Sequence, residues 1–153
     1  MTTASATTIQ ELLNKLKKID FISFGVKRFF PEVKHKLLIE RNSFEKELGN
    51  CYERIGYFYL SGNIPIIFTC AMISLDKTKK ELIDNLIAQR GPFGELLRKH
   101  YPNSKIESKT ISFEEIVNLP DCFYKIAKER FASQHKRYII VDGKKIAIAI
   151  EYI

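Results

Sequence analysis

The end of the chain predicts an antiparallel β-hairpin, and no other feature constrains the fold as much. Asp142-Gly143 is a dipeptide preferred in type I′ turns, and apolar segments flank it at 138–141 and 146–153. Glu151 lies in the second segment, between uncharged neighbours. An ionised group in an apolar strand is costly unless a partner compensates its charge. The hairpin therefore predicts an antiparallel sheet with a polar position inside it.

Further segments predict the remaining strands and the helices. Ser61-Gly62-Asn63 joins two stretches rich in β-branched and aromatic residues, which is a hairpin signal. The expected strands are 33–39, 51–60, 64–73 and 105–113, and the expected helices are 9–18, 24–30, 77–89, 95–100 and 121–130. The lysines of 33–39 favour an edge position for that strand. We predict an α+β fold: a single antiparallel sheet of five to six strands with helices on one face and at one end.

Composition and charge limit the classes of protein. Lys and Arg number 25 against 18 Asp and Glu, so the formal net charge is +7, which suits a solvated surface, a small anionic ligand or a nucleic acid. The three cysteines lack metal-ligand spacing, so neither a zinc site nor a disulfide framework is expected. No secretory signal or membrane-spanning run is present. We expect one domain over residues 1–153, with residues 1–8 disordered.

The sequence lacks the motifs of several common enzyme classes. It contains no P-loop, dinucleotide fingerprint, nucleophile elbow or zinc-protease motif. His35, His100 and His135 stand in basic or surface-like contexts, and we expect each to be solvated. Neither a metal nor an organic cofactor is expected.

Arg54 and Glu151 are the candidate site residues. A guanidinium suits bidentate binding of a carboxylate, and the alternative is a surface arginine paired with Glu53 or Glu107. Glu151 either accepts a hydrogen bond from a ligand hydroxyl or is exposed at the end of its strand. One buried cation and one buried anion in a small sheet would form a pocket for a charged small molecule.

Two other segments also have two interpretations. Gly91-Pro92-Phe93-Gly94 is either a turn between helices or a helix N-terminus whose free N–H groups bind an anion. Tyr57, Phe58 and Tyr59 are either core residues or a platform for stacking RNA bases. Core packing is favoured for the aromatic residues because neighbours on a strand face opposite sides.

Three motifs in register resemble the chorismate lyase family, including its short archaeal, cyanobacterial and plastid-encoded relatives. They are Arg54 with Gly62 eight residues further on, Pro92-Phe93-Gly94-Glu95-Leu96-Leu97, and Gly143-Lys144 followed by an apolar strand to Glu151. The resemblance covers most of the chain from Asp20 onward. It implies an antiparallel sheet of about six strands with an internal ligand cavity.

The resemblance also implies a lyase that needs no metal or cofactor and converts chorismate to 4-hydroxybenzoate and pyruvate in quinone biosynthesis. Carried over to this sequence, the catalytic residues are Arg54, which binds the ring carboxylate, and Glu151, which binds the ring hydroxyl. Backbone groups of Phe93 and Ile22 complete the substrate site. The implied partners are a small anionic substrate and an aromatic product, with no nucleic acid or membrane, in the cytoplasm or a plastid stroma.

The sequence departs from this family at several positions. Cys70 stands where many relatives have an arginine, for which Arg90 is a candidate substitute, and Phe93 and Lys145 replace a leucine and a proline. Two alternatives stay open: a binding protein of the same fold that does not turn over its ligand, and a basic RNA-binding module. Related effector-sensing domains of bacterial regulators follow a winged-helix domain, for which we expect too little chain before Asp20.

Overall fold

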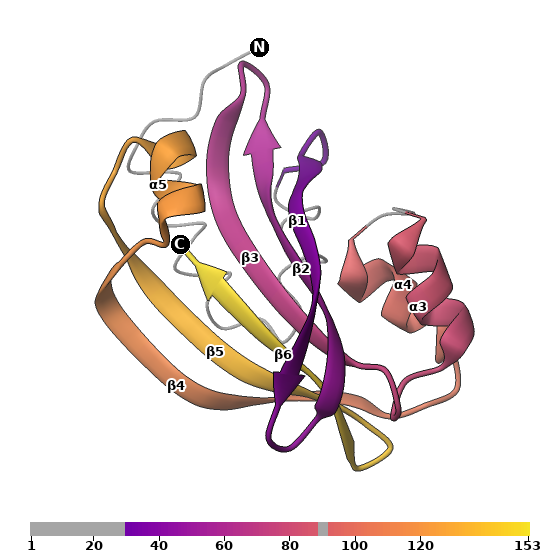
Figure 1. Ribbon diagram of the computed structural model, residues 1–153. Coiled ribbons are helices and arrows are strands. Elements are labelled where there is room, and N and C mark those ends of the chain that lie inside the picture. The colour runs from indigo at the N-terminus through magenta and orange to yellow at the C-terminus, as the bar shows by residue number, and fades with distance from the viewer. Residues whose placement is uncertain (1–29, 89–91) are drawn as a thin grey trace.

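Six strands form a single antiparallel sheet in the computed structural model, which describes residues 30–88 and 92–153 (Figure 1). The strands are β1 (Lys34–Glu45), β2 (Gly49–Leu60), β3 (Ile64–Ser74), β4 (Ile106–Asn118), β5 (Phe131–Val141) and β6 (Lys144–Tyr152), and the helices are α3 (Lys80–Ile87), α4 (Phe93–His100) and α5 (Asp121–Ala127). The strand order is β1-β2-β3-β6-β5-β4. The predicted α+β class with a single antiparallel sheet is confirmed.

The last strand of the chain lies in the interior of the sheet. β6 pairs with β3 on one side and with β5 on the other, so Glu151 is carried into the centre of the molecule. Gly62 and Gly143 turn the two hairpins that the sequence predicted, with φ of 80° and 78°, a left-handed conformation that favours glycine. β1 and β4 are the two edges, and the edge position of β1 agrees with the prediction from its lysines.

Helices cover both faces of the sheet (Figure 1). α3 and α4 bury apolar side chains against one face, and the buried residues of these helices are Leu82, Ile83, Leu86, Leu96 and Leu97. α5 packs on the opposite face, where the Phe123 ring lies 4.8 Å from that of Phe68 and 5.7 Å from that of Tyr152, measured between centroids. Because both faces are covered, polar side chains in the central strands are removed from water.

The main departure from the predicted elements lies in β5. We expected a strand only at 138–141, whereas β5 begins at Phe131. Its buried positions alternate with less buried ones, but the first three buried residues are Ser133, His135 and Arg137. A strand that turns polar side chains inward lacks the apolar alternation by which strands are recognised.

Other boundaries differ less. β4 continues beyond the predicted end at 113 to Asn118, and α5 ends at Ala127 because Lys128 adopts a left-handed φ of 58°. The predicted helices at 9–18 and 24–30 lie, except for Phe30, outside the described residues. The single domain over 1–153 and the disorder of residues 1–8 stay predictions.

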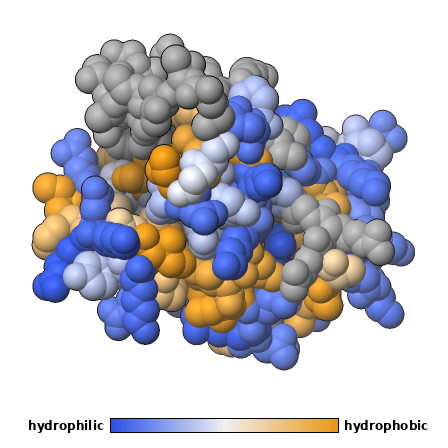
Figure 2. Space-filling view, turned by 90° about the horizontal axis from the view of Figure 1, so that it is seen from above, coloured by the Kyte–Doolittle hydropathy of each residue, from blue (hydrophilic) through white to orange (hydrophobic). Residues whose placement is uncertain are grey.

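The surface is mixed in character. Seen from above the view of Figure 1, apolar areas are separated by hydrophilic residues (Figure 2). Among the helices within residues 30–88 and 92–153, none has the length and apolar character needed to cross a bilayer.

Candidate ligand-binding site

Two rows of residues cross the centre of the sheet, and all of their members except His135 line the floor of a pocket. The strand register places the first row in the order Arg54, Ala71, Ala149 and Arg137. The second row, two residues further along, is Gly56, Thr69, Glu151 and His135. Side chains two apart on a strand share a face, so both rows lie on the face that α3 and α4 cover. The two alanines leave open space between two arginines.

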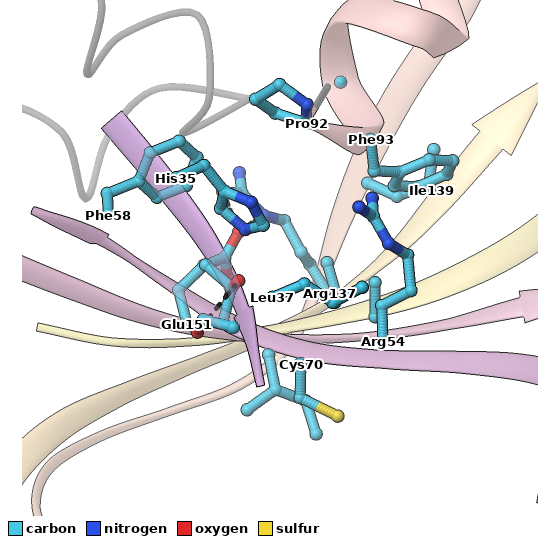
Figure 3. Close-up of a pocket in the computed structure, with 16 residues that line it drawn as sticks. His35, Leu37, Arg54, Phe58, Cys70, Pro92, Phe93, Arg137, Ile139 and Glu151 are labelled. Atoms are coloured by element: carbon cyan, nitrogen blue, oxygen red, sulfur yellow. Dashed lines mark hydrogen bonds and ion pairs between the residues drawn. The ribbon is translucent and has the colours of Figure 1, made fainter. Parts of the chain in front are cut away.

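The N-terminus of α4 forms the wall opposite this floor (Figure 3). Pro92, Phe93 and Gly94 line the pocket there, and the first-turn N–H groups of a helix have no acceptor within it. The pocket volume is about 80 Å³. A cavity needs only about 10–15 Å³ on this measure to hold one water molecule, so the pocket has room for a small molecule.

Arg137 and Glu151 form a buried ion pair in the pocket. The Arg137 Nε and Nη2 groups donate to Glu151 Oε1 at 3.0 Å and 2.5 Å, and the two residues are 1% and 5% exposed. Burial raises the pKa of the Glu151 carboxyl, and the Arg137 guanidinium opposes that rise. The other oxygen, Glu151 Oε2, is buried and receives no hydrogen bond from the described residues. The site therefore presents a hydrogen-bond acceptor with spare capacity.

Arg54 is buried on the other side of the alanine floor and is 6% exposed. The two partners considered for a surface arginine are engaged elsewhere, because Glu53 accepts from Arg41 at 2.7 Å and Glu107 pairs with Lys105 at 3.3 Å. The interpretation of Arg54 as a surface residue is therefore wrong. The guanidinium lies in the pocket lining (Figure 3).

Tyr52 and Glu40 hold Arg54 in place. The Tyr52 hydroxyl donates to the Glu40 carboxylate, which lies opposite Arg54 in the β1–β2 register, and it also hydrogen-bonds Arg54. Burial raises the pKa of the Tyr52 hydroxyl, so Tyr52 stays protonated. Burial lowers the pKa of Arg54, and Tyr52 and Glu40 oppose that shift.

His35 and His135 are also part of this region, so the prediction that they are solvated is wrong. Burial, and then the nearby Arg54, lower the pKa of His35 to about 4. Burial, and then Arg137, lower the pKa of His135. His35 lines the pocket, whereas His135 does not and instead contacts Thr110 Oγ1 through Nε2 at 2.9 Å.

His100, the third histidine, lies at the end of α4 away from the pocket. It is half-buried, and its Nε2 lies 2.6 Å from Asn85 Nδ2. It contributes nothing to the pocket lining.

Phe93 and Cys70, two positions where this sequence departs from the chorismate lyase family, lie in different environments. Phe93 lines the pocket, but Cys70 directs its thiol to the opposite face, where it donates to Glu53 Oε1 at 3.3 Å. Figure 3 shows this thiol pointing away from the pocket. The pocket nevertheless contains a second arginine, because β5 supplies Arg137. Ile22 and Arg90 lie outside the described residues.

The adjacent aromatic residues on β2 belong to the interior. Tyr57 packs against Phe68 at a centroid distance of 5.7 Å, and Phe58 is 4% exposed and lines the pocket. These residues pack in the core, as the favoured interpretation predicted, and they do not form an exposed platform for stacking bases. Within the described chain, no group of three or more His, Cys, Asp or Glu side chains is arranged to hold a metal ion.

Comparison with known proteins identifies the fold but no family. No protein-family profile and no curated protein sequence matches the chain. Solved structures do match. The C-terminal domain of Yurk from Bacillus subtilis has a TM-score of 0.62 at 13% identity, with 78% of this chain and 88% of that one covered.

Two further solved structures name the regulator class. A GntR-family transcriptional regulator from Bacillus cereus has a TM-score of 0.56 at 12% identity, with 79% of this chain and 90% of that one covered. The ligand-binding domain of a regulator assigned to the GntR family, from Bordetella bronchiseptica, has a TM-score of 0.59 at 12% identity, covering 79% and 85%. The fold is shared with regulatory domains.

These matches correct the assignment to the chorismate lyase family. The fold is chorismate lyase-like, but two of these three structures are GntR-family regulators by name, and none of the three is named as a lyase. The prediction of a chorismate pyruvate-lyase, with its place in quinone biosynthesis, is therefore wrong. The physical reason is that the turns at Gly62 and Gly143 and the helix start at Phe93 are features of this backbone, whatever chemistry it carries. The non-catalytic alternative fits these neighbours better.

Proposed function

We propose that this chain is a small-molecule-binding domain that recognises an anionic ligand without converting it. One observation carries this proposal: Arg54 and Arg137 flank a floor of two alanines inside a covered pocket. Two cations held near each other in a low-dielectric interior are unfavourable unless anions compensate them, and here Glu151 pairs with Arg137 while Glu40 lies opposite Arg54. A bound anion would supply further negative charge. The likeness to ligand-binding domains of regulators supports the same function.

The pocket also indicates which groups the ligand carries. A carboxylate or phosphate would lie between the guanidinium of Arg54 and the N-terminus of α4 at Phe93, since both favour negative charge. A hydroxyl or ammonium group would donate to Glu151 Oε2, the acceptor that the described residues leave unused. The body of the ligand would lie on Ala71 and Ala149. This assigns ligand-binding roles to Arg54, Phe93 and Glu151.

Thermal unfolding with simple probes tests this function. 4-Hydroxybenzoate carries a carboxylate and a hydroxyl, benzoate lacks the hydroxyl, and sulfate supplies an anion alone. A ligand that binds only the folded protein raises Tm in a concentration-dependent way. We expect 4-hydroxybenzoate to raise Tm more than benzoate does, and chromatography to recover it unchanged. A response to sulfate that exceeds both would identify a phosphate-like ligand instead.

A matched pair of variants controls this experiment. Arg54→Ala removes the pocket cation, whereas Arg41→Ala removes a cation of the same sheet whose partner, Glu53, lies on the opposite face. We expect the Tm response to disappear only in Arg54→Ala. If no probe raises Tm, or if both variants respond alike, the proposed function is wrong.

A further inference from the structure

His35 occupies a position in the pocket that a glycine makes available. A Cβ atom at Gly56 would lie 3.0 Å from His35 Nε2 and 2.4 Å from the backbone oxygen of Lys36. The missing side chain at Gly56 thus allows β1 to approach β2 closely and lets the imidazole lie over the floor. The Phe58 ring meets the imidazole edge-on at a centroid distance of 4.9 Å. Packing therefore holds His35 inside the pocket, although it comes from an edge strand.

The groups that face His35 make its charge depend on the contents of the pocket. Arg54 and Arg137 are cations in the same lining, Glu151 is an anion already paired with Arg137, and the α4 residues in the lining carry no charge. His135, which is buried, lies on the far side of Glu151 and outside the lining. The nearest charge on the β2 side of the pocket is thus a cation. Burial first, and then the Arg54 charge, keep the imidazole neutral while the pocket is empty.

We propose that His35 takes up a proton when an anion enters the pocket and becomes its third cationic contact, so that ligand binding is coupled to pH. This inference rests on the proposed function, because it requires an anion at the site. The proton comes from the solvent and is carried by the imidazole, and no bond of the ligand changes. The anion offsets the Arg54 charge that opposes protonation. Binding and protonation then favour each other reciprocally.

The difference between the His35 pKa in the free protein and in the complex sets how strongly binding depends on pH. The pKa of His35 is about 4 in the empty pocket. If an anion restores it to the ordinary value of about 6.5, binding at about pH 5.5 becomes roughly tenfold tighter than at about pH 7.5. Sulfate is the suitable probe for this measurement, because it stays a dianion throughout that range.

Calorimetric titration with sulfate, over this pH range, tests the inference. We expect the roughly tenfold change in the wild type, the same change in His135→Gln, and a loss of most of it in His35→Gln. His135→Gln is the matched control because His135 is buried beside an arginine but does not line the pocket. An unchanged pH dependence in His35→Gln would overturn the inference and leave the proposed function intact. Absence of sulfate binding in the wild type would overturn the inference, and absence of both sulfate and 4-hydroxybenzoate binding would also overturn the proposed function.

A second measurement avoids reliance on a variant that fails to fold. The Cε1–H resonance of His35 reports its protonation in the wild-type protein. With saturating sulfate we expect its titration to move upward by one pH unit or more from about 4, while the His135 resonance moves less. A titration of His35 that is the same with and without sulfate would contradict the inference.

Discussion

Arg137 on β5 and Glu151 on β6 face the same covered pocket, and two hydrogen bonds from the arginine end on one carboxylate oxygen. The second oxygen, Glu151 Oε2, is buried and accepts no hydrogen bond from the described residues. Such a pair supports the fold through its charge, and the proposed function gives its second oxygen a role in ligand recognition. The two roles are separable by experiment, because stability is measurable without a ligand.

Glu151→Gln tests the structural role of the pair. The amide keeps the size of the side chain but leaves the Arg137 charge buried without its anion, and removing one partner of a buried pair typically costs about 3–5 kcal/mol. We expect a loss of this order in urea unfolding. Glu107→Gln is the control, since its pair with Lys105 is exposed and should change stability by no more than about 1 kcal/mol. Equal losses in the two variants would contradict this account.

Ala149→Leu tests whether the alanine floor is the ligand space. Leucine would project into the gap between Arg54 and Arg137 and displace any bound molecule. We expect the Tm response to 4-hydroxybenzoate to disappear while the unliganded protein still unfolds cooperatively. Ala147→Leu, one row away in the packed core, is the comparison, and overpacking there costs about 1–3 kcal/mol. Retention of the full ligand response in Ala149→Leu would place the ligand elsewhere.

The unliganded protein should lose stability in mild acid through His35. Its pKa is about 4 when folded and about 6.5 when unfolded, so the unfolded state binds more protons between these values. The contribution of neutral His35 to the free energy of unfolding is complete above about pH 6.5 and declines as the pH falls toward 4. Urea midpoints across this range should fall less in His35→Gln than in the wild type. The raised pKa of Glu151 acts in the opposite sense, and its contribution is common to both proteins.

Gly56→Ala tests the close approach of β1 that brings His35 into the pocket. The new methyl group would meet a backbone oxygen at 2.4 Å, so β1 must move away. We expect a loss of stability above about 2 kcal/mol, in the range of disruptive core substitutions, together with a rise of the His35 pKa toward its usual value. Gly62→Ala meets no atom within 4 Å and should cost only about 1–2 kcal/mol for its left-handed φ. A smaller loss in Gly56→Ala than in Gly62→Ala would be inconsistent with this packing.

Most strands and helices were predictable because residues close together in the sequence specify them. Turn residues at Gly62 and Asp142-Gly143 specify hairpins, and apolar periodicity specifies α3 and α4. The sequence left open whether Arg54 and Glu151 are buried or exposed, and the structure shows that both are buried. The motifs shared with the lyase family follow from the same backbone geometry, which is why they predicted the fold correctly and the activity wrongly.

Only the tertiary structure decided which side chains meet. Arg137 was missed because its strand turns Ser133 and His135 inward and so lacks an apolar alternation. His35 looked solvated between two lysines, but strand alternation directs those lysines to the other face while Gly56 makes room for the imidazole. Cys70 stands where many relatives of the lyase family have an arginine, but its thiol lies on the face of β3 opposite the pocket, beside Glu53.

The sequence by itself determined the hairpins, the helices α3, α4 and α5 and the α+β class, and it named Arg54 and Glu151 as candidates for charged residues inside the sheet. The pairing of Arg137 with Glu151, the alanine floor between the arginines and the placement of His35 required the strand order and register. The physical reason is range. Turns and periodicity act between residues a few positions apart, whereas this pocket joins residues as far apart in the sequence as His35 and Glu151, and those contacts exist only after the sheet has formed.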